Sequence, residues 1–255
     1  MFEVSDEGAV RWLTIANPGH RNAIPTGQWG RLAELIAEFE ASEERVLVVT
    51  GAGEDFCSGA DVGSDFIPGS LADGYAMLEQ VGAAALALYR CTKPTLAAVD
   101  GVAAGAGLNL ALGCDVAIAS DRARFSEIFV RRGLTLDFGG TWLLPRRIGL
   151  ARAKELSLTG RVVDAVEAER IGLVGRVVPA ADLAEAARTT AVELAAGAPL
   201  AQRFVKAGLD RSLEMTFEQA LAFEQSAQAL LLTSEDFIEG VVSFVEKRPP
   251  EFHGR

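Results

Sequence analysis

The chain has 255 residues, and 35 aspartates and glutamates against 24 lysines and arginines leave a formal net charge of −11. A chain of this length forms one large domain, or one domain with an appendage, and buries roughly 70 to 75% of its unfolded surface without disulfide or metal support. The acidic balance argues against nucleic acid as a partner, because an extended footprint needs clustered positive charge to displace counterions from phosphates.

The predicted elements alternate between strands and helices over the first part of the chain. In order, they are a strand over residues 10–16, a helix that begins near residues 25 and 26, a strand over 45–50, a helix over 71–89, a strand over 94–99, a short helix after residue 105 and a strand over 115–119. The first helix is indicated by Trp29, Leu32, Ile36 and Phe39, which recur at helical spacing. This alternation predicts an α/β core.

No segment after about residue 178 has the pattern of a β-strand. The remainder reads as helices over residues 183–196, 199–213, 217–232 and 234–247, with Pro199 at a helix start. We therefore expect a boundary between residues 179 and 198, with an α/β core before it and a helical region after it.

The numbers of cysteines and histidines disfavour several kinds of catalytic and metal site. Three widely spaced cysteines without a CxxC pair favour a reducing, cytoplasmic setting and predict no zinc site. Acidic residues near the start predict no signal peptide, and no uncharged run in the glycine-rich middle reaches the roughly 18 residues that span a bilayer. Because only His20 and His253 are present, triad hydrolysis and histidine-held metals are disfavoured, and the expected acid or base is a carboxylate.

Two segments of small residues each follow a predicted strand, over residues 51–62 and 100–110. Small residues let a ligand approach the backbone closely, although the first segment is also compatible with a mobile loop and the second with tight helix packing. Neither matches a dinucleotide fingerprint, and the chain has no GK[ST] motif, which disfavours nicotinamide, flavin and nucleoside triphosphate. Two turns with free backbone N–H groups would instead suit an oxygen that gains negative charge, as in an oxyanion hole.

A third segment, over residues 129–146, contains one carboxylate among apolar neighbours. Asp137 stands beside Leu136 and Phe138, and desolvation raises the pKa of such a group toward the range of a general base. The alternative is that Asp137 caps the helix that would follow Gly139. Asp61, Asp100 and Asp115 also adjoin small or apolar residues, where each is equally explained as a cap or turn former.

Together, the three segments resemble the crotonase superfamily of enoyl-CoA hydratases and isomerases. The resemblance rests on the order and spacing of short motifs along nearly the whole chain: residues 17–18, 21–23, 56–62, 101–112, 139–141, 144–146, 158–161, 172–174, 177–179, 239–241 and 244–248. It implies a spiral of ββα units over residues 1–195, followed by a helical trimerisation region over 196–255. It also implies a homotrimer or a dimer of trimers that acts on an acyl-CoA thioester, with no other cofactor and no metal.

The resemblance assigns roles to individual residues. It places the two oxyanion donors on the backbone N–H groups of Ala60 and Ala106. The CoA arm and substrate would be lined by Arg21, Ala23, Ser58, Gly59, Asp61, Val62, Gly105, Asn109, Phe129 and Arg132, with Lys247 reaching a phosphate across a subunit boundary. For Arg21 and Lys247 the alternative is an ordinary solvated charge.

The chain departs from the hydratase pattern at its two glutamates. Those positions hold Asn109 and Phe129, neither of which transfers a proton; a two-residue shift in the alignment would place Glu127 at the second. Asp137 occupies the position at which some family isomerases, such as those resembling 1,2-epoxyphenylacetyl-CoA isomerase, carry a catalytic acid. The leading hypothesis is an isomerase with Asp137 as its single acid–base group, and the alternatives are an enoyl-CoA hydratase or a catalytically silent CoA-binding protein.

The acyl group is not specified by any motif. Aromatic and apolar side chains at Phe66, Tyr75, Met77, Phe129, Phe138 and Trp142 either line a pocket that accepts an aromatic acyl group or belong to the ordinary core.

Overall fold

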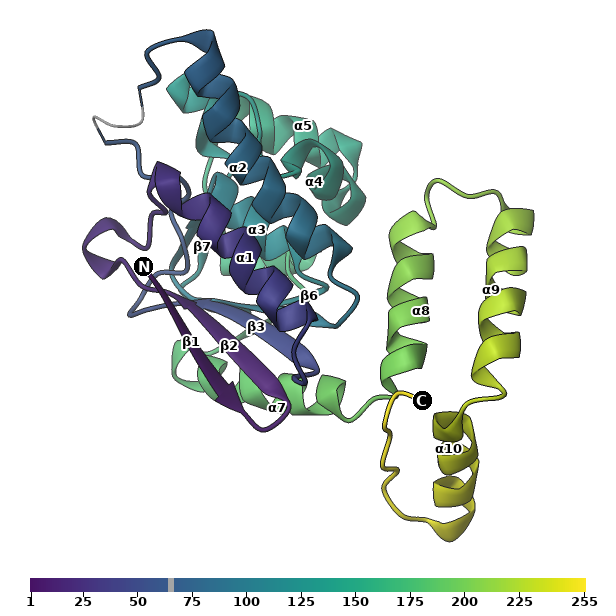
Figure 1. Ribbon diagram of the computed structural model, residues 1–255. Coiled ribbons are helices and arrows are strands. Elements are labelled where there is room, and N and C mark those ends of the chain that lie inside the picture. Colours follow the sequence, from purple (N-terminus) through teal and green to yellow (C-terminus); the bar gives the residue numbers. More distant parts are fainter. Residues whose placement is uncertain (64–66) are drawn as a thin grey trace.

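A computed structural model of the chain describes residues 1–63 and 67–255, and its centre is a six-stranded sheet (Figure 1). The strands are β1 (Phe2–Glu7), β2 (Val10–Ile15), β3 (Val46–Gly51), β4 (Thr95–Val99), β6 (Val116–Ser120) and β9 (Arg176–Val178), in the order β1-β2-β3-β4-β6-β9. The β1–β2 pair is antiparallel and the other neighbours are parallel. The predicted α/β core is therefore confirmed.

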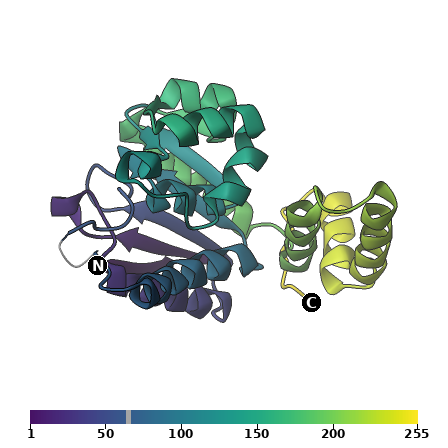
Figure 2. The same cartoon turned by 90° about the horizontal axis from the view of Figure 1, so that it is seen from above.

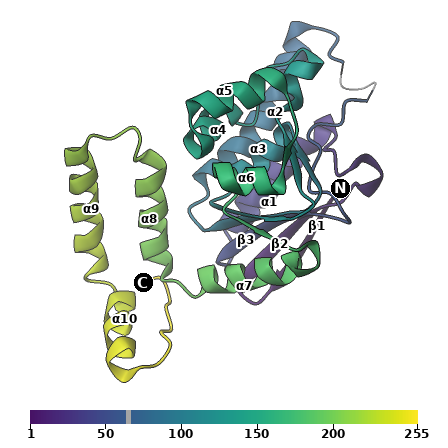
Figure 3. The same cartoon turned by 180° about the vertical axis from the view of Figure 1, so that it is seen from behind.

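Helices cover both faces of this sheet, because alternate side chains of the strands point to opposite sides. One face, which includes Leu13 and Val49, packs on α1 (Trp29–Glu40), α2 (Leu71–Arg90) and α3 (Ala106–Gly113). The other face, which includes Val48 and Leu96, packs on Ala187 and Ala191 of α7 (Leu183–Ala195). Figure 3 shows α7 on the side of the sheet opposite α1 and α2.

A small second sheet lies next to the start of α3. It consists of β5 (Val102–Ala104), β7 (Arg124–Ser126) and β8 (Val163–Asp164), in the order β5-β7-β8. The 3-10 helix η4 (Ile128–Arg132) follows β7, and α4 (Gly140–Ile148), α5 (Leu150–Thr159) and α6 (Ala165–Ile171) complete this side. The remaining 3-10 turns are η1 (Pro18–His20), η2 (Thr26–Gln28) and η5 (Ala180–Asp182).

The last three helices project from the core as an arm (Figures 1 and 2). They are α8 (Pro199–Arg211), α9 (Phe217–Leu231) and α10 (Glu235–Glu246). The arm contacts the core through an ion pair of 2.8 Å between Lys206 Nζ and Asp115 Oδ2, and Arg45 donates to the carbonyl oxygen of Phe252. Large apolar side chains remain on its surface, among them Phe217, which is 74% exposed, and Phe244, which is 84% exposed. No helix in the described part of the chain is long and apolar enough to cross a bilayer.

The predicted elements occur within two or three residues of their expected bounds, and several short elements were not predicted. Strand β1 is one of these, since five of its six residues are exposed and only Phe2 and Val4 in it are apolar. It exists because β2 supplies a partner in the register Phe2↔Ile15 to Glu7↔Val10. Strands β5, β7 and β8 are three residues or fewer in length, too short to show periodicity.

Candidate active site

The two glycine-rich segments lie side by side. The backbone N–H of Cys57 donates to the carbonyl of Val102 at 2.9 Å, and that of Ala104 donates to the carbonyl of Cys57 at 3.0 Å. A Cβ atom added to Gly107 would lie 2.2 Å from the Cys57 carbonyl oxygen. Glycine is therefore required here for close contact between α3 and the first segment, which is the packing role anticipated for the second segment.

Ala60 and Ala106 both follow a glycine with a left-handed backbone. The φ angle is 98° at Gly59 and 55° at Gly105. Ala106 is the first residue of α3, and within residues 1–63 and 67–255 no acceptor is bound by the N–H of Ala60 or Ala106. An added Cβ on Gly59 would lie 3.4 Å from the backbone nitrogen of Ala106, so the two turns are in contact. Two free donors at one place, one of them at a helix start, can hold a developing oxyanion.

The loop before η2 holds the Ala60 turn in position. Ile24 N–H donates to the Gly59 carbonyl at 2.8 Å, and Ser58 N–H donates to the Arg21 carbonyl at 3.0 Å. Asn22 is fully buried with φ at 57°, and its amide donates to the carbonyls of Ala52 and Asp55. Asparagine is among the few non-glycine residues that adopt this backbone readily. In the sequence, Asn22 belongs to the motif at residues 21–23, but its burial is visible only in the structure.

A cavity of about 580 Å³ opens over these two turns. Most of the predicted site residues line it: Arg21, Ala23, Ser58, Gly59, Ala60, Asp61, Val62, Gly105, Ala106, Phe129, Arg132 and Asp137. His20, which was not predicted, also lines it and pairs with Asp61 at 3.1 Å between Nδ1 and Oδ2. Two predicted residues do not line it: Asn109 is buried behind the wall, and Lys247 lies at the end of α10 on the arm.

Asp137 contributes a desolvated carboxyl group to this cavity. Its Oδ1 atom is buried and accepts no hydrogen bond from the described residues. Burial raises the pKa of Asp137 from the usual 3.8 to about 6. The alternative that its side chain caps α4 is wrong, because Gly139 is the N-cap and only the backbone carbonyl of Asp137 accepts the N–H of Gly140. A carboxylate with this pKa suits proton abstraction near neutral pH.

A second carboxyl group, that of Glu127, lies behind the cavity wall. Glu127 is 1% exposed, whereas its neighbours Ile128 and Phe129 line the cavity. The pKa of Glu127 is raised to about 8, first by burial and then by the charge of Asp137, against a lowering by the Asn109 amide. Asn109 also donates from Nδ2 to the Asp137 carbonyl at 3.0 Å. The sequence pattern places Glu127 at the second glutamate position only with a shift of two residues, and the burial of Glu127 is visible only in the structure.

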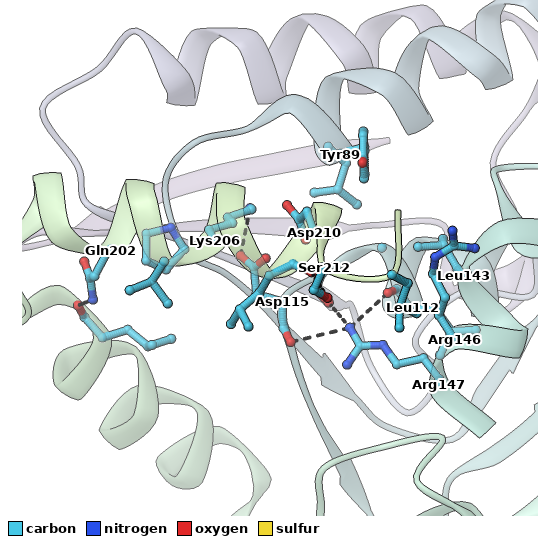
Figure 4. A pocket seen from close by; sticks show the side chains of 18 of the residues that line it. Tyr89, Leu112, Asp115, Leu143, Arg146, Arg147, Gln202, Lys206, Asp210 and Ser212 are labelled. Atoms are coloured by element: carbon cyan, nitrogen blue, oxygen red, sulfur yellow. Dashed lines mark hydrogen bonds and ion pairs between the residues drawn. The ribbon is translucent and has the colours of Figure 1, made fainter. Parts of the chain in front are cut away.

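A larger cavity of about 650 Å³ lies between the core and α8 (Figure 4). Among its charged groups, Lys206 pairs with Asp115 and Arg147 donates to the carbonyls of Leu112 and Cys114, whereas the pKa of Asp210 is raised by burial. Arg146 stacks on Trp142 at 3.7 Å from the ring centroid. The N–H donors of Ala60 and Ala106 do not line this larger cavity, so the smaller cavity is the candidate active site. Asp100 likewise has structural partners, Ser120 and Arg122.

The aromatic residues are divided between core and surface. Phe138 is 3% exposed and packs on Trp29 at 5.7 Å between ring centroids, as expected for the core. Phe129 lines the cavity, and Tyr75 is 66% exposed on α2. Phe66 lies outside the described residues.

Known proteins share this fold and sequence pattern. The family model described as "Enoyl-CoA hydratase/isomerase" matches residues 5–255. A "Probable enoyl-CoA hydratase" of Rhodobacter capsulatus is 40% identical, covering 100% of this chain and 97% of that protein. The 1,2-epoxyphenylacetyl-CoA isomerase of Escherichia coli is 36% identical, covering 98% and 97%. The crystal structure of an enoyl-CoA hydratase from Bacillus anthracis matches with a TM-score of 0.95 at 30% identity, covering 100% and 99%.

The family model spans nearly the whole chain, and the solved structure matches the sheet, the helices and the arm together. The expected fold class is thereby confirmed. The chain belongs to the enoyl-CoA hydratase/isomerase family and has the crotonase fold.

Proposed function

We propose that the protein is an acyl-CoA thioester isomerase that uses Asp137 as its single acid–base group. The observation that carries this proposal is the state of the carboxylates that line the cavity. Among the described lining residues these are Asp61 and Asp137. Asp61 is paired with His20, whereas Asp137 has a raised pKa and an oxygen without a partner. Asp137 is thus the group suited to exchange a proton with the substrate.

The arrangement supports a proton transfer within the acyl chain. Asp137 removes a proton from one carbon, and the electron pair moves toward the thioester oxygen, which accepts hydrogen bonds from the N–H groups of Ala60 and Ala106. The same proton returns from Asp137 to the carbon two positions along, and the double bond moves. Each backbone donor of this kind is typically worth about 3 to 4 kcal/mol in the transition state. No water needs to be activated in this sequence.

Hydration of a 2-enoyl-CoA is the second candidate function. It is favoured by Glu127, which places a second carboxyl group close enough for the charge of Asp137 to raise its pKa. The name of the Rhodobacter capsulatus relative points the same way. Against it stands the burial of Glu127, which is 1% exposed and is not among the residues that line the cavity.

The experiment that tests the proposal follows a conjugated thioester by ultraviolet absorbance. We expect the purified protein to convert a 3-enoyl-CoA into the conjugated 2-enoyl-CoA, with growing absorbance. Loss of absorbance from a 2-enoyl-CoA, with no gain from the 3-enoyl-CoA, would instead establish a hydratase. Saturable CoA-ester binding without either change would indicate a silent binding protein and reject both enzymatic proposals.

We propose further that residues 1–195 carry the ester site and that residues 196–255 mediate assembly into a trimer or a dimer of trimers. Phe217, Phe244 and Val245 are largely exposed in the single chain, more apolar surface than an isolated arm would leave in water. In such an assembly Lys247 would serve the cavity of a neighbouring subunit. Light scattering should give a mass three or six times 27.0 kDa, and Phe244→Asp should lower it; a monomeric wild-type protein would contradict the assembly.

A further inference from the structure

Three groups with unpaired acceptor atoms, from Asn109, Glu127 and Asp137, meet at the cavity wall. In this cluster, the buried atoms without a partner among the described residues are Asn109 Oδ1, both carboxyl oxygens of Glu127 and Asp137 Oδ1. One N–H of the Asn109 Nδ2 group donates to the Asp137 carbonyl at 3.0 Å, and the other is directed toward the Glu127 carboxyl group, whose pKa it lowers. Buried acceptors without donors are costly, typically by about 1 to 3 kcal/mol each. The Asn109 amide cannot satisfy all four of these atoms, and a proton on one of the two carboxyl groups supplies a further donor.

Glu127 and Asn109 are both positioned by backbone hydrogen bonds of the second glycine-rich segment, residues 100–110. The N–H of Gly105 donates to the Ser126 carbonyl, directly before Glu127, and the N–H of Asn109 donates to the Gly105 carbonyl one helical turn later. A Cβ added to Gly140, near Asp137, would lie 2.4 Å from Asn109 Nδ2. The cluster is therefore part of the close packing that also forms the oxyanion turn at Ala106.

We propose that Glu127 is a positioning residue for Asp137: it stays protonated in the working protein, donates a hydrogen bond within this cluster, and leaves the single negative charge of the pair on Asp137. This inference rests on the proposed role of Asp137 as the base. Glu127 acts through Asp137 and does not touch the substrate, because it is buried and does not line the cavity, unlike its neighbours Ile128 and Phe129.

The charges around Glu127 agree with a protonated state. Burial and the charge of Asp137, from the segment before α4, disfavour a negative charge on Glu127, and they outweigh the hydrogen bond from the neutral Asn109 amide on α3, which lowers its pKa. On η4 itself, Arg131 donates to the Thr159 carbonyl of α5, and Arg132 lines the cavity. Within the described residues, no cation pairs with the Glu127 carboxyl group. Two carboxyl groups held close together in a dry site share one charge, as like charges disfavour each other.

The pH dependence of turnover follows from this assignment. With a pKa of about 8 for Glu127, the donor is lost as the pH rises above about 8, so kcat should fall on the alkaline side. In Glu127→Gln the amide keeps a donor at every pH, and the alkaline fall should disappear. In Glu127→Ala the donor is absent throughout, and kcat at pH 7 should fall at least tenfold, with Glu127→Gln restoring most of that loss.

A comparison of Glu127→Gln with Glu127→Ala distinguishes a positioning role for Glu127 from direct proton transfer and from no role in turnover. If Glu127→Gln loses as much activity as Glu127→Ala, Glu127 transfers a proton itself and the proposal is overturned. If the alkaline fall persists in Glu127→Gln, or if both variants match the wild type, the proposal is likewise overturned.

A readout without activity separates this inference from the proposed function. Infrared spectra at pH 6.5 should show the band of a protonated carboxylic acid in the wild type. The band should be lost in Glu127→Gln. It should be retained in Asp210→Asn, whose carboxyl group lies in the other cavity. Absence of the band would overturn the inference even if isomerase activity is found. Its presence without any isomerase activity would reject the proposed function and leave the protonated state of Glu127 established.

Discussion

Replacement of Asp137 by Asn should lower kcat on a 3-enoyl-CoA by about 10²- to 10⁴-fold, the usual contribution of a positioned acid–base group. Asparagine has nearly the same shape, so the cavity and the two backbone donors stay in place, while the group that takes and returns the proton is lost. The affinity for a CoA ester, measured by calorimetry, should change little. Retention of wild-type turnover in this variant would remove Asp137 from the mechanism.

Thermal stability provides the control for folding. The pKa of Asp137 is raised in the folded protein to about 6, so the folded state binds a proton that the unfolded chain releases between about pH 3.8 and 6. Across that window the stability of the wild type falls as pH rises, by at most roughly 1.4 kcal/mol per pH unit. Asp137→Asn lacks this group and should be more stable than the wild type above pH 6.

The matched control is Asp210→Asn. Asp210 also has a pKa raised by burial, but it lines the cavity between the core and α8. Its replacement should leave turnover within twofold of the wild type. A loss comparable to that of Asp137→Asn would indicate that removal of any desolvated carboxylate disturbs the protein, and the specific role of Asp137 would then be unsupported.

Replacement of Gly59 by Ala should lower kcat by about 10²- to 10³-fold, the usual cost of losing one oxyanion donor. Gly59 has a φ angle of 98°, which residues with a side chain rarely adopt, and the added Cβ would lie 2.8 Å from the Ala104 carbonyl oxygen. Both conflicts are relieved only by moving the backbone that carries the Ala60 N–H. The enolate-like transition state then loses a hydrogen bond that stabilises it more than it stabilises the ground state.

Gly82→Ala is the control for this glycine. Gly82 lies inside α2, and an added Cβ meets nothing within 4 Å, so turnover should be unchanged and stability should rise by up to about 1 kcal/mol. Steady-state kinetics and thermal unfolding of the two variants make the comparison. If Gly59→Ala keeps full turnover with normal KM, the Ala60 N–H does not stabilise the transition state.

The sequence by itself determined the α/β core, the helical C-terminal region, two glycine-rich turns and Asp137 as the candidate base, while the resemblance to the family placed the two donors on Ala60 and Ala106. These features are local. The strands and helices follow from the period of apolar residues, and the turns follow from glycines such as Gly59 and Gly105, whose positive φ angles only a residue without a side chain adopts freely.

Only the tertiary structure decided which of these residues meet, and at what burial. Asn109 and Asp137 are 28 residues apart in the chain and are joined by a hydrogen bond, and Glu127 lies buried beside them, whereas Lys247 stands on the arm away from the cavity. Burial and partnership between distant segments depend on how whole elements pack, which no local pattern records. The protonation of Glu127 and Asp137 is set by that packing, because desolvation and a neighbouring charge, and not residue type, displace their pKa values.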